Sequence, residues 1–84
     1  MFRFPENIRC NHVDDGSVVL DTGRGLIFSF NRSASRILQL LEIGAERDAI
    51  VERIVQEFGA APQVAESDVC EFLNLLQENQ LLES

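Results

Sequence analysis

The side chains that could carry out chemistry in this chain are few and scattered. The only histidine, His12, stands near Asp14 and Asp15. A single histidine beside a predicted hairpin turn is more typical of a solvated or structural side chain than of a base or ligand. The segment Asp14-Asp15-Gly16 resembles a fragment of a calcium-binding loop, but the remaining ligand positions of such a loop are missing. We therefore interpret this segment as a turn.

Other groups that could react or bind also lack the partners that such sites need. Cys10 and Cys70 are too few and too far apart for a zinc site or a disulfide framework, and we interpret them as two free thiols, although one bridge between them stays open. Gly23-Arg24-Gly25 precedes a predicted strand and lacks the spacing of a phosphate-binding loop. Ser33 and Ser35 have no histidine nearby in the pattern. The sequence therefore predicts no enzyme activity, no metal site and no cofactor.

Length and charge restrict the function further. The chain of 84 residues, with a net charge of −7, is predicted to form a single domain over residues 1–84. All 7 basic residues are arginines within residues 1–53, whereas residues 54–84 hold acids and no base. This acidic part repels phosphate, so we expect a neutral or basic partner and no nucleic acid. No long apolar run or signal-peptide pattern is present, which predicts a cytoplasmic protein without a membrane partner.

Three short strands are expected in the first part of the chain. They run from Ile8 to Val13, from Ser17 to Asp21 and from Leu26 to Phe30. Gly16 is suited to the positive φ of a bulged hairpin loop, and Thr22 to Gly25 form a second tight turn. Two short turns in succession predict an antiparallel meander whose third strand lies at an edge. Residues 1–7 leave two alternatives, a frayed lead-in or a segment held on the core by Phe2 and Phe4.

The third strand has two different faces and ends at a helix cap. The face expected in the core consists of Leu26, Phe28 and Phe30. Ile27 and Ser29 lie on the other face. Asn31 fits an N-cap whose side-chain oxygen accepts the amide proton of Ser33 or Ala34. The strand therefore joins a β half of the chain to an α half.

Three amphipathic helices are expected after this strand. They run from Arg32 to Glu42, from Glu46 to Phe58 and from Pro62 to about Asn79, and Gly44 and Gly59 are suited to end the first two. The buried stripe of the third helix is predicted to be Ala65, Val69, Phe72, Leu73 and Leu76. Helices packed on one face of a three-stranded sheet give an α+β fold, which we interpret as a winged helix-turn-helix.

A winged helix-turn-helix makes DNA binding a rival hypothesis. The third helix carries no arginine or lysine, and docking it on DNA would bury Glu66, Asp68 and Glu71 against phosphates. The charge therefore argues against a winged-helix DNA-binding protein, which we keep as the alternative from another class. A small dimerisation module that pairs its edge strands is a third alternative.

The order and spacing of several weak motifs resemble one known family. The matching segments are Val19 to Ala34, Ile37-Leu38, Gly44, Ile50 to Phe58 and Asp68-Val69-x-x-Phe72-Leu73-x-x-Leu76. Together they are similar to the PqqD-like proteins, the recognition elements of ribosomally made peptide natural products. The resemblance covers residues 8–83. It implies a non-catalytic adaptor that binds the leader segment of a precursor peptide and presents it to a leader peptidase or a modifying enzyme.

The resemblance also implies where the leader lies. The leader adds as a strand to residues 26–30 and lies against the third helix. We expect the groove floor to be formed by Ile27 and Ser29 with Leu26 and Phe28 beside them, and the wall by Val64, Asp68, Glu71, Phe72 and Leu75. Asp68 and Glu71 could meet a Lys or Arg of the leader, although a solvated helix face is the alternative. Phe72 and Leu75 could hold an apolar anchor, with a core position as the alternative for Phe72.

At one segment this sequence differs from the usual family pattern, and the difference bears on which biosynthetic pathway the protein serves. Family members from pyrroloquinoline quinone biosynthesis usually carry Pro-Glu-Gly before the third strand, where this chain has Asp21-Thr22-Gly23. The shorter form is more similar to the freestanding recognition proteins of lasso-peptide pathways, which serve a separate leader peptidase. We favour the lasso type. A partner of a radical-SAM maturase, including the quinone pathway, is the alternative within the family.

Overall fold

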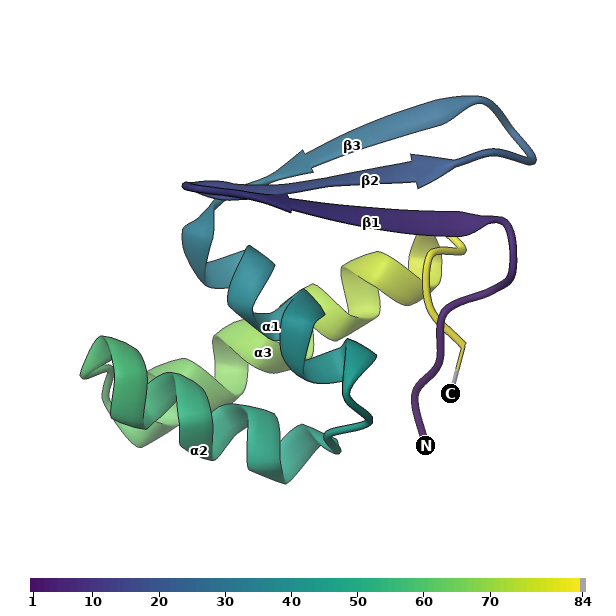
Figure 1. The fold of residues 1–84 in the computed structure, drawn as a ribbon. Helices are drawn as coiled ribbons and strands as arrows, with labels where there is room; N and C mark the ends of the chain where they lie inside the picture. The colour runs from purple at the N-terminus through teal and green to yellow at the C-terminus, as the bar shows by residue number, and fades with distance from the viewer. Residues whose placement is uncertain (84) are drawn as a thin grey trace.

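A computed structural model describes residues 1–83 of the chain, in which three strands precede three helices. The elements are β1 (Ile8–Val13), β2 (Gly16–Asp21), β3 (Leu26–Phe30), α1 (Arg32–Glu42), α2 (Arg47–Phe58) and α3 (Pro62–Glu78). The strands form one antiparallel sheet in the order β1-β2-β3, and the helices lie on one side of it (Figure 1). The predicted α+β arrangement and the edge position of the third strand are confirmed. The winged helix-turn-helix label stays an interpretation of the sequence.

The core lies between the inner face of the sheet and the three helices. Its fully buried members include Val19 of β2, Leu38 of α1, Ile50 of α2 and Leu76 of α3. The predicted stripe of α3 is buried at Ala65, Val69, Leu73 and Leu76, as expected from its helical spacing. Phe72 alone among the predicted stripe is half-buried, because it stands at the margin of α3 that faces β3.

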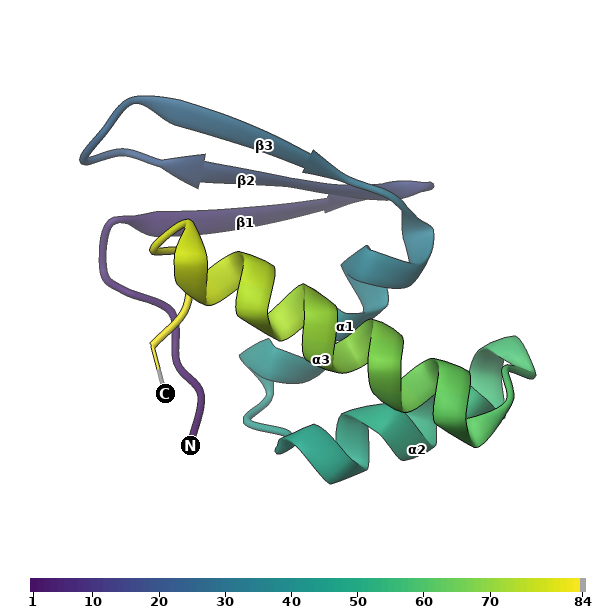
Figure 2. The same cartoon turned by 180° about the vertical axis from the view of Figure 1, so that it is seen from behind.

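The two ends of the chain lie side by side beneath the sheet (Figures 1 and 2). Arg3 and Glu83 exchange two backbone hydrogen bonds of 2.8 Å, each amide nitrogen donating to the other residue's carbonyl oxygen. Phe2 and Phe4 pack against the core. Of the two alternatives for residues 1–7, the structure therefore has the segment that is held on the core and not the frayed one.

Gly16 plays a different part from the predicted one. It begins β2, and positive φ occurs instead at Gly25, Gly44 and Gly59 among the described glycines. A Cβ atom at Gly16 would lie 2.2 Å from the carbonyl oxygen of Phe30. Gly16 is therefore required by the close approach of β3, while Asp14 and Asp15 form the turn by themselves. The prediction of a positive φ at this position was wrong.

The ends of the helices follow the sequence signals closely. Asn31 caps α1, its side-chain oxygen accepting the amide proton of Ala34 at 3.0 Å, as predicted. Gly59 ends α2 with a φ of 66°. No helix within residues 1–83 is long and apolar enough to cross a bilayer. In the same residues no three His, Cys, Asp or Glu side chains gather as a metal site, and Cys10 and Cys70 are free.

Candidate functional site

The outer edge of β3 carries unpaired backbone groups. The carbonyl oxygen of Phe30 points toward β2, because it lies against Gly16, and Phe30 pairs with Ser17. Backbone groups of successive residues in a strand point to opposite sides, so Phe28 and Leu26 also bond to β2. The N–H and C=O groups of Ile27 and Ser29 therefore face the free edge. These are the groups that an added strand would use.

The side chains of β3 divide between the two faces of the sheet. Phe28 stands opposite Val19, which is fully buried, so Phe28 and its period-two neighbours Leu26 and Phe30 face the helices. The side chains of Ile27 and Ser29 project from the opposite face, and that of Ile27 is 71% exposed. These two side chains therefore lie outside the face that packs on the helices, and their role in peptide binding stays a prediction. The N–H and C=O groups of Ile27 and Ser29 lie in the plane of the sheet, at its free edge, while their side chains stand perpendicular to it.

A groove of about 310 Å³ lies where α3 passes the start of α1. Its lining residues are Asn31, Ser33, Ala34, Ile37, Asp68, Glu71, Phe72 and Leu75. Four of the five predicted wall residues are thus brought together. Val64 lies outside this lining, on the first turn of α3, and is 54% exposed.

The contribution of α1 to the groove was not predicted. Ala34 and Ile37 share the apolar face of that helix, and Ile37 is also buried in the core. Their i, i+3 spacing also places them beside the cap residue Asn31, so the same face reaches the groove at its end. The hydrophobic period of α1 predicts which of its residues lie on this face. It does not predict that α3 lies beside the same face and completes the groove.

Aromatic side chains connect the strand to the helix beneath the groove. The ring of Phe72 on α3 meets the ring of Phe30 on β3 edge to face, with centroids 5.3 Å apart. Phe28 stacks on Phe30 with centroids 6.5 Å apart. Leu26 and Leu75 flank this row and are 41% and 42% exposed. The floor between β3 and α3 is therefore apolar and partly open to solvent.

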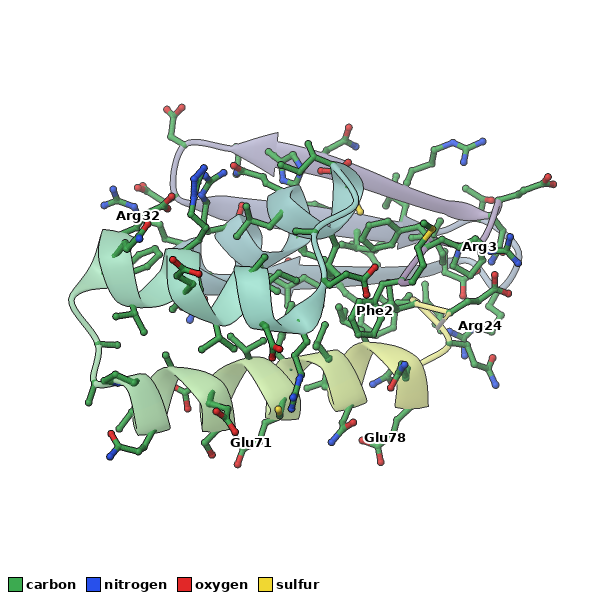
Figure 3. All side chains as sticks on the ribbon, turned by 90° about the horizontal axis from the view of Figure 1, so that it is seen from below. Phe2, Arg3, Arg24, Arg32, Glu71 and Glu78 are labelled. Carbon is green, nitrogen blue, oxygen red and sulfur yellow. The ribbon has the colours of Figure 1, made fainter. Side chains whose placement is uncertain are left out.

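The helix side of the groove is acidic. Asp68 and Glu71 are exposed, and neither makes an ion pair with any other residue between 1 and 83. Figure 3 shows Glu71 on α3, with Arg32 near one end of the molecule and Arg24 near the other. Two carboxylates beside an apolar floor suit a ligand that carries apolar side chains and a basic one.

Asp21 anchors the turn that leads into β3. It is 1% exposed, and its Oδ1 accepts protons from Asn7 Nδ2 at 2.8 Å and from the amides of Gly23 and Arg24 at 3.1 and 3.0 Å. Its Oδ2 accepts from Arg24 Nε at 2.6 Å. The hydrogen bond from the Arg24 side chain is the largest cause that lowers the pKa of Asp21 to about 2. Asp21 is thus a buried, fully bonded carboxylate.

A second polar network joins a histidine, a glutamate and two serines, which are residue types that can form a catalytic triad. His12 contacts Glu42 through Nε2 and Ser17 Oγ through Nδ1 at 2.5 Å, and Ser17 Oγ contacts Ser35 Oγ. His12 is therefore connected to Ser35 only through the hydroxyl of Ser17. Ser17 and Ser35 are 2% and 3% exposed, so both side chains are buried. The network ties the sheet to α1.

A larger hollow of about 470 Å³ lies elsewhere, on the side of α1 that faces the β1–β2 turn and the end of α2. Arg36 and Glu57 line it and bond to each other at 2.7 and 2.9 Å, which leaves both charges satisfied. It does not adjoin the free edge of β3. The smaller groove is therefore the candidate site. It combines apolar side chains with carboxylates that have no ion-pair partner among residues 1–83, and it lies at the Asn31 end of β3, whose free edge carries the open backbone groups.

One family model and two solved structures match the chain. The PqqD family, described as coenzyme PQQ synthesis protein D, matches residues 16–82. A solved structure described as "TbiB1 in Complex with the TbiA(beta) Leader Peptide" is 32% identical, covers 98% of this chain and 95% of its own, and has a TM-score of 0.92. Another, "Lasso peptide synthetase B1 complexed with the leader peptide", is 26% identical over 99% of this chain and 98% of its own, with a TM-score of 0.90. No curated protein matches.

Proposed function

Because the chain belongs to the PqqD family, we propose that it is a non-catalytic adaptor for the leader segment of a ribosomally synthesised precursor peptide. The leader adds as a strand to the free edge of β3 and packs against α3. The adaptor then presents the bound precursor to a separate enzyme. The two similar solved structures, each of a protein in complex with a leader peptide, support this proposal.

The free edge of β3 is the observation that carries the proposal. Ile27 and Ser29 offer two N–H and two C=O groups to an extended peptide, and each bond made contributes about 1 kcal/mol net. Backbone bonds fix a strand in place and tolerate many sequences. Such an edge suits a protein whose ligand is a segment of another chain rather than a small molecule.

Selectivity comes from the side chains around the groove. A leader strand beside β3 directs every second side chain toward the floor formed by Phe28, Phe30 and Phe72. Asp68 and Glu71 attract a lysine or arginine of the leader. Leu75, which is 42% exposed, supplies apolar surface for an anchor residue.

The proposed partner enzyme is a leader peptidase of the lasso-peptide type. The similarity to the structure described as "Lasso peptide synthetase B1 complexed with the leader peptide" favours this partner over a radical-SAM maturase, which stays the alternative. The buried hydroxyls of Ser17 and Ser35 support an adaptor without catalysis of its own. We place the protein in the cytoplasm, where ribosomal precursors are made.

Binding of a synthetic leader tests the proposal directly. The probe is a fluorescein-labelled N-terminal segment of the precursor peptide encoded beside this chain, with a scrambled copy as its control. We expect a Kd in the micromolar range or tighter for the leader, and at least about tenfold weaker binding of the scrambled peptide. Equal binding of both peptides would contradict the proposal. Retardation of a random DNA duplex with a steep salt dependence would instead favour the DNA-binding alternative.

A further inference from the structure

We propose that Arg24 is a positioning residue that holds β3 and α3 at the spacing a leader strand requires. This inference rests on the proposed function and names a residue outside the groove lining. Arg24 lies in the β2–β3 turn, two residues before β3 begins, and 40% of its side chain is exposed. Its guanidinium joins the turn to the last turn of α3.

The contacts of Arg24 run in two directions. Nε donates to Oδ2 of the buried Asp21 at 2.6 Å, and Nη2 donates to the carbonyl oxygen of Asn79. Asn79 is the C-cap of α3, and its amide nitrogen and Nδ2 both donate to the carbonyl oxygen of Leu75, at 3.1 and 2.8 Å. Because Leu75 lines the groove, Arg24 is connected through two hydrogen bonds to a groove residue.

Few other contacts hold the strand and the helix together. The Phe30–Phe72 ring contact joins β3 to α3 toward the Asn31 end of the groove. At the other end, the Arg24 bond to Asn79 is the hydrogen bond that joins the β2–β3 turn to the end of α3 within residues 1–83. Figure 3 shows Arg24 beside the end of α3. The groove is therefore fixed at two points, one aromatic and one polar.

The geometry of arginine explains why this residue type stands here. A guanidinium presents several N–H groups in a rigid plane, so it can serve Asp21 and a backbone carbonyl at once. Asp21 in turn is held by Asn7 and by two backbone amides, which leaves little freedom to the carboxylate. A lysine keeps the charge near Asp21 but presents a single compact ammonium. We expect Arg24→Lys to lose the bond to Asn79 while it keeps the turn.

A matched pair of variants separates positioning from stability. Arg36→Lys is the control, because Arg36 also joins two elements, α1 to α2, through a two-pronged bond with Glu57 that lies outside the groove. Affinity for the labelled leader is measured for both variants well below their melting temperatures. We expect Arg24→Lys to weaken binding about tenfold and Arg36→Lys to change it less than twofold. Amide resonances of free Arg24→Lys should move at Leu26, Leu75 and Asn79.

A second variant covers the case in which Arg24→Lys does not fold. The double variant Asp21→Asn/Arg24→Met removes both charges together and leaves no unpaired buried carboxylate. It should also bind the leader about tenfold more weakly than the unmodified protein. Unchanged affinity in a folded Arg24 variant would overturn the positioning role and leave the proposed function intact. Absence of binding by the unmodified protein would overturn both.

Discussion

Phe30 and Phe72 meet edge to face, with ring centroids 5.3 Å apart, and this contact joins the edge strand to α3, the helix whose Phe72 lines the groove. Edge-to-face pairs of this kind contribute about 1 kcal/mol beyond the area they bury. The two rings therefore serve the stability of the domain and the shape of the groove floor together.

A double-mutant cycle of Phe30→Leu and Phe72→Leu tests this coupling. Each single variant should have a lower free energy of unfolding than the unmodified protein. The loss in the double variant should be smaller than the sum of the two single losses, with a coupling free energy of about 1 kcal/mol. Urea unfolding followed by circular dichroism gives the four values. Additive losses would show that the rings stabilise the fold independently.

Proline substitutions in β3 should separate the free edge from the paired edge. Ile27→Pro removes an N–H that faces outward, so we expect the fold to persist and leader binding to weaken about tenfold. Ile27→Ala is its control for the lost side chain and should bind more nearly like the unmodified protein. Phe28→Pro removes a bond to β2 and should lower the melting temperature markedly. If Ile27→Pro destabilised the domain as much as Phe28→Pro, the assignment of the free edge would be wrong.

The carboxylates on the acidic side of the groove should strengthen leader binding in a salt-dependent way. Asp68→Asn/Glu71→Gln should weaken binding of a leader that carries lysine or arginine by about three- to fivefold at low salt. The difference in affinity between this variant and the unmodified protein should disappear near 1 M NaCl, where exposed charges are screened within about 3 Å. Glu66→Gln, on the same helix but outside the groove lining, is the control and should leave binding unchanged. An equal effect of Glu66→Gln would point to net charge rather than to this site.

The low pKa of Asp21 predicts a specific acid sensitivity. Its folded-state pKa of about 2 lies below the ordinary value of 3.8, so the unfolded chain binds this proton more readily. The stabilisation is therefore present above about pH 4 and is lost as the pH falls toward 2. Unfolding free energies of the protein and of Asp21→Asn, measured between pH 2 and 6, should converge toward the acid end. A constant difference across that range would contradict the pKa assigned to Asp21.

The sequence predicted the elements of this fold because their signals are local. Alternation placed Leu26, Phe28 and Phe30 on one face, and Asn31 and Gly59 marked ends of helices. The spacing of Asp68, Glu71 and Leu75 also predicted that they share one flank of α3, whereas the family resemblance, not the spacing, placed the leader beside that helix. These inferences needed no knowledge of distant contacts.

The errors and omissions all concern contacts between elements. Gly16 is required by the carbonyl of Phe30, which the sequence does not place nearby. For Ile27 and Ser29, the sequence predicts a strand but not that pairing with β2 leaves their backbone groups at the free edge. The link from Arg24 to Asn79 spans 55 positions in the chain, and no local pattern signals it.

The central claim is that a leader strand pairs with the free edge of β3, and an NMR titration tests it most directly. Unlabelled leader is added to ¹⁵N-labelled protein, and hydrogen exchange is followed for each backbone amide. We predict that the amides of Ile27 and Ser29 become strongly protected on binding, and that resonances of Asp68 to Leu75 shift. Saturation by the leader with Ile27 and Ser29 still exchanging freely would contradict the account.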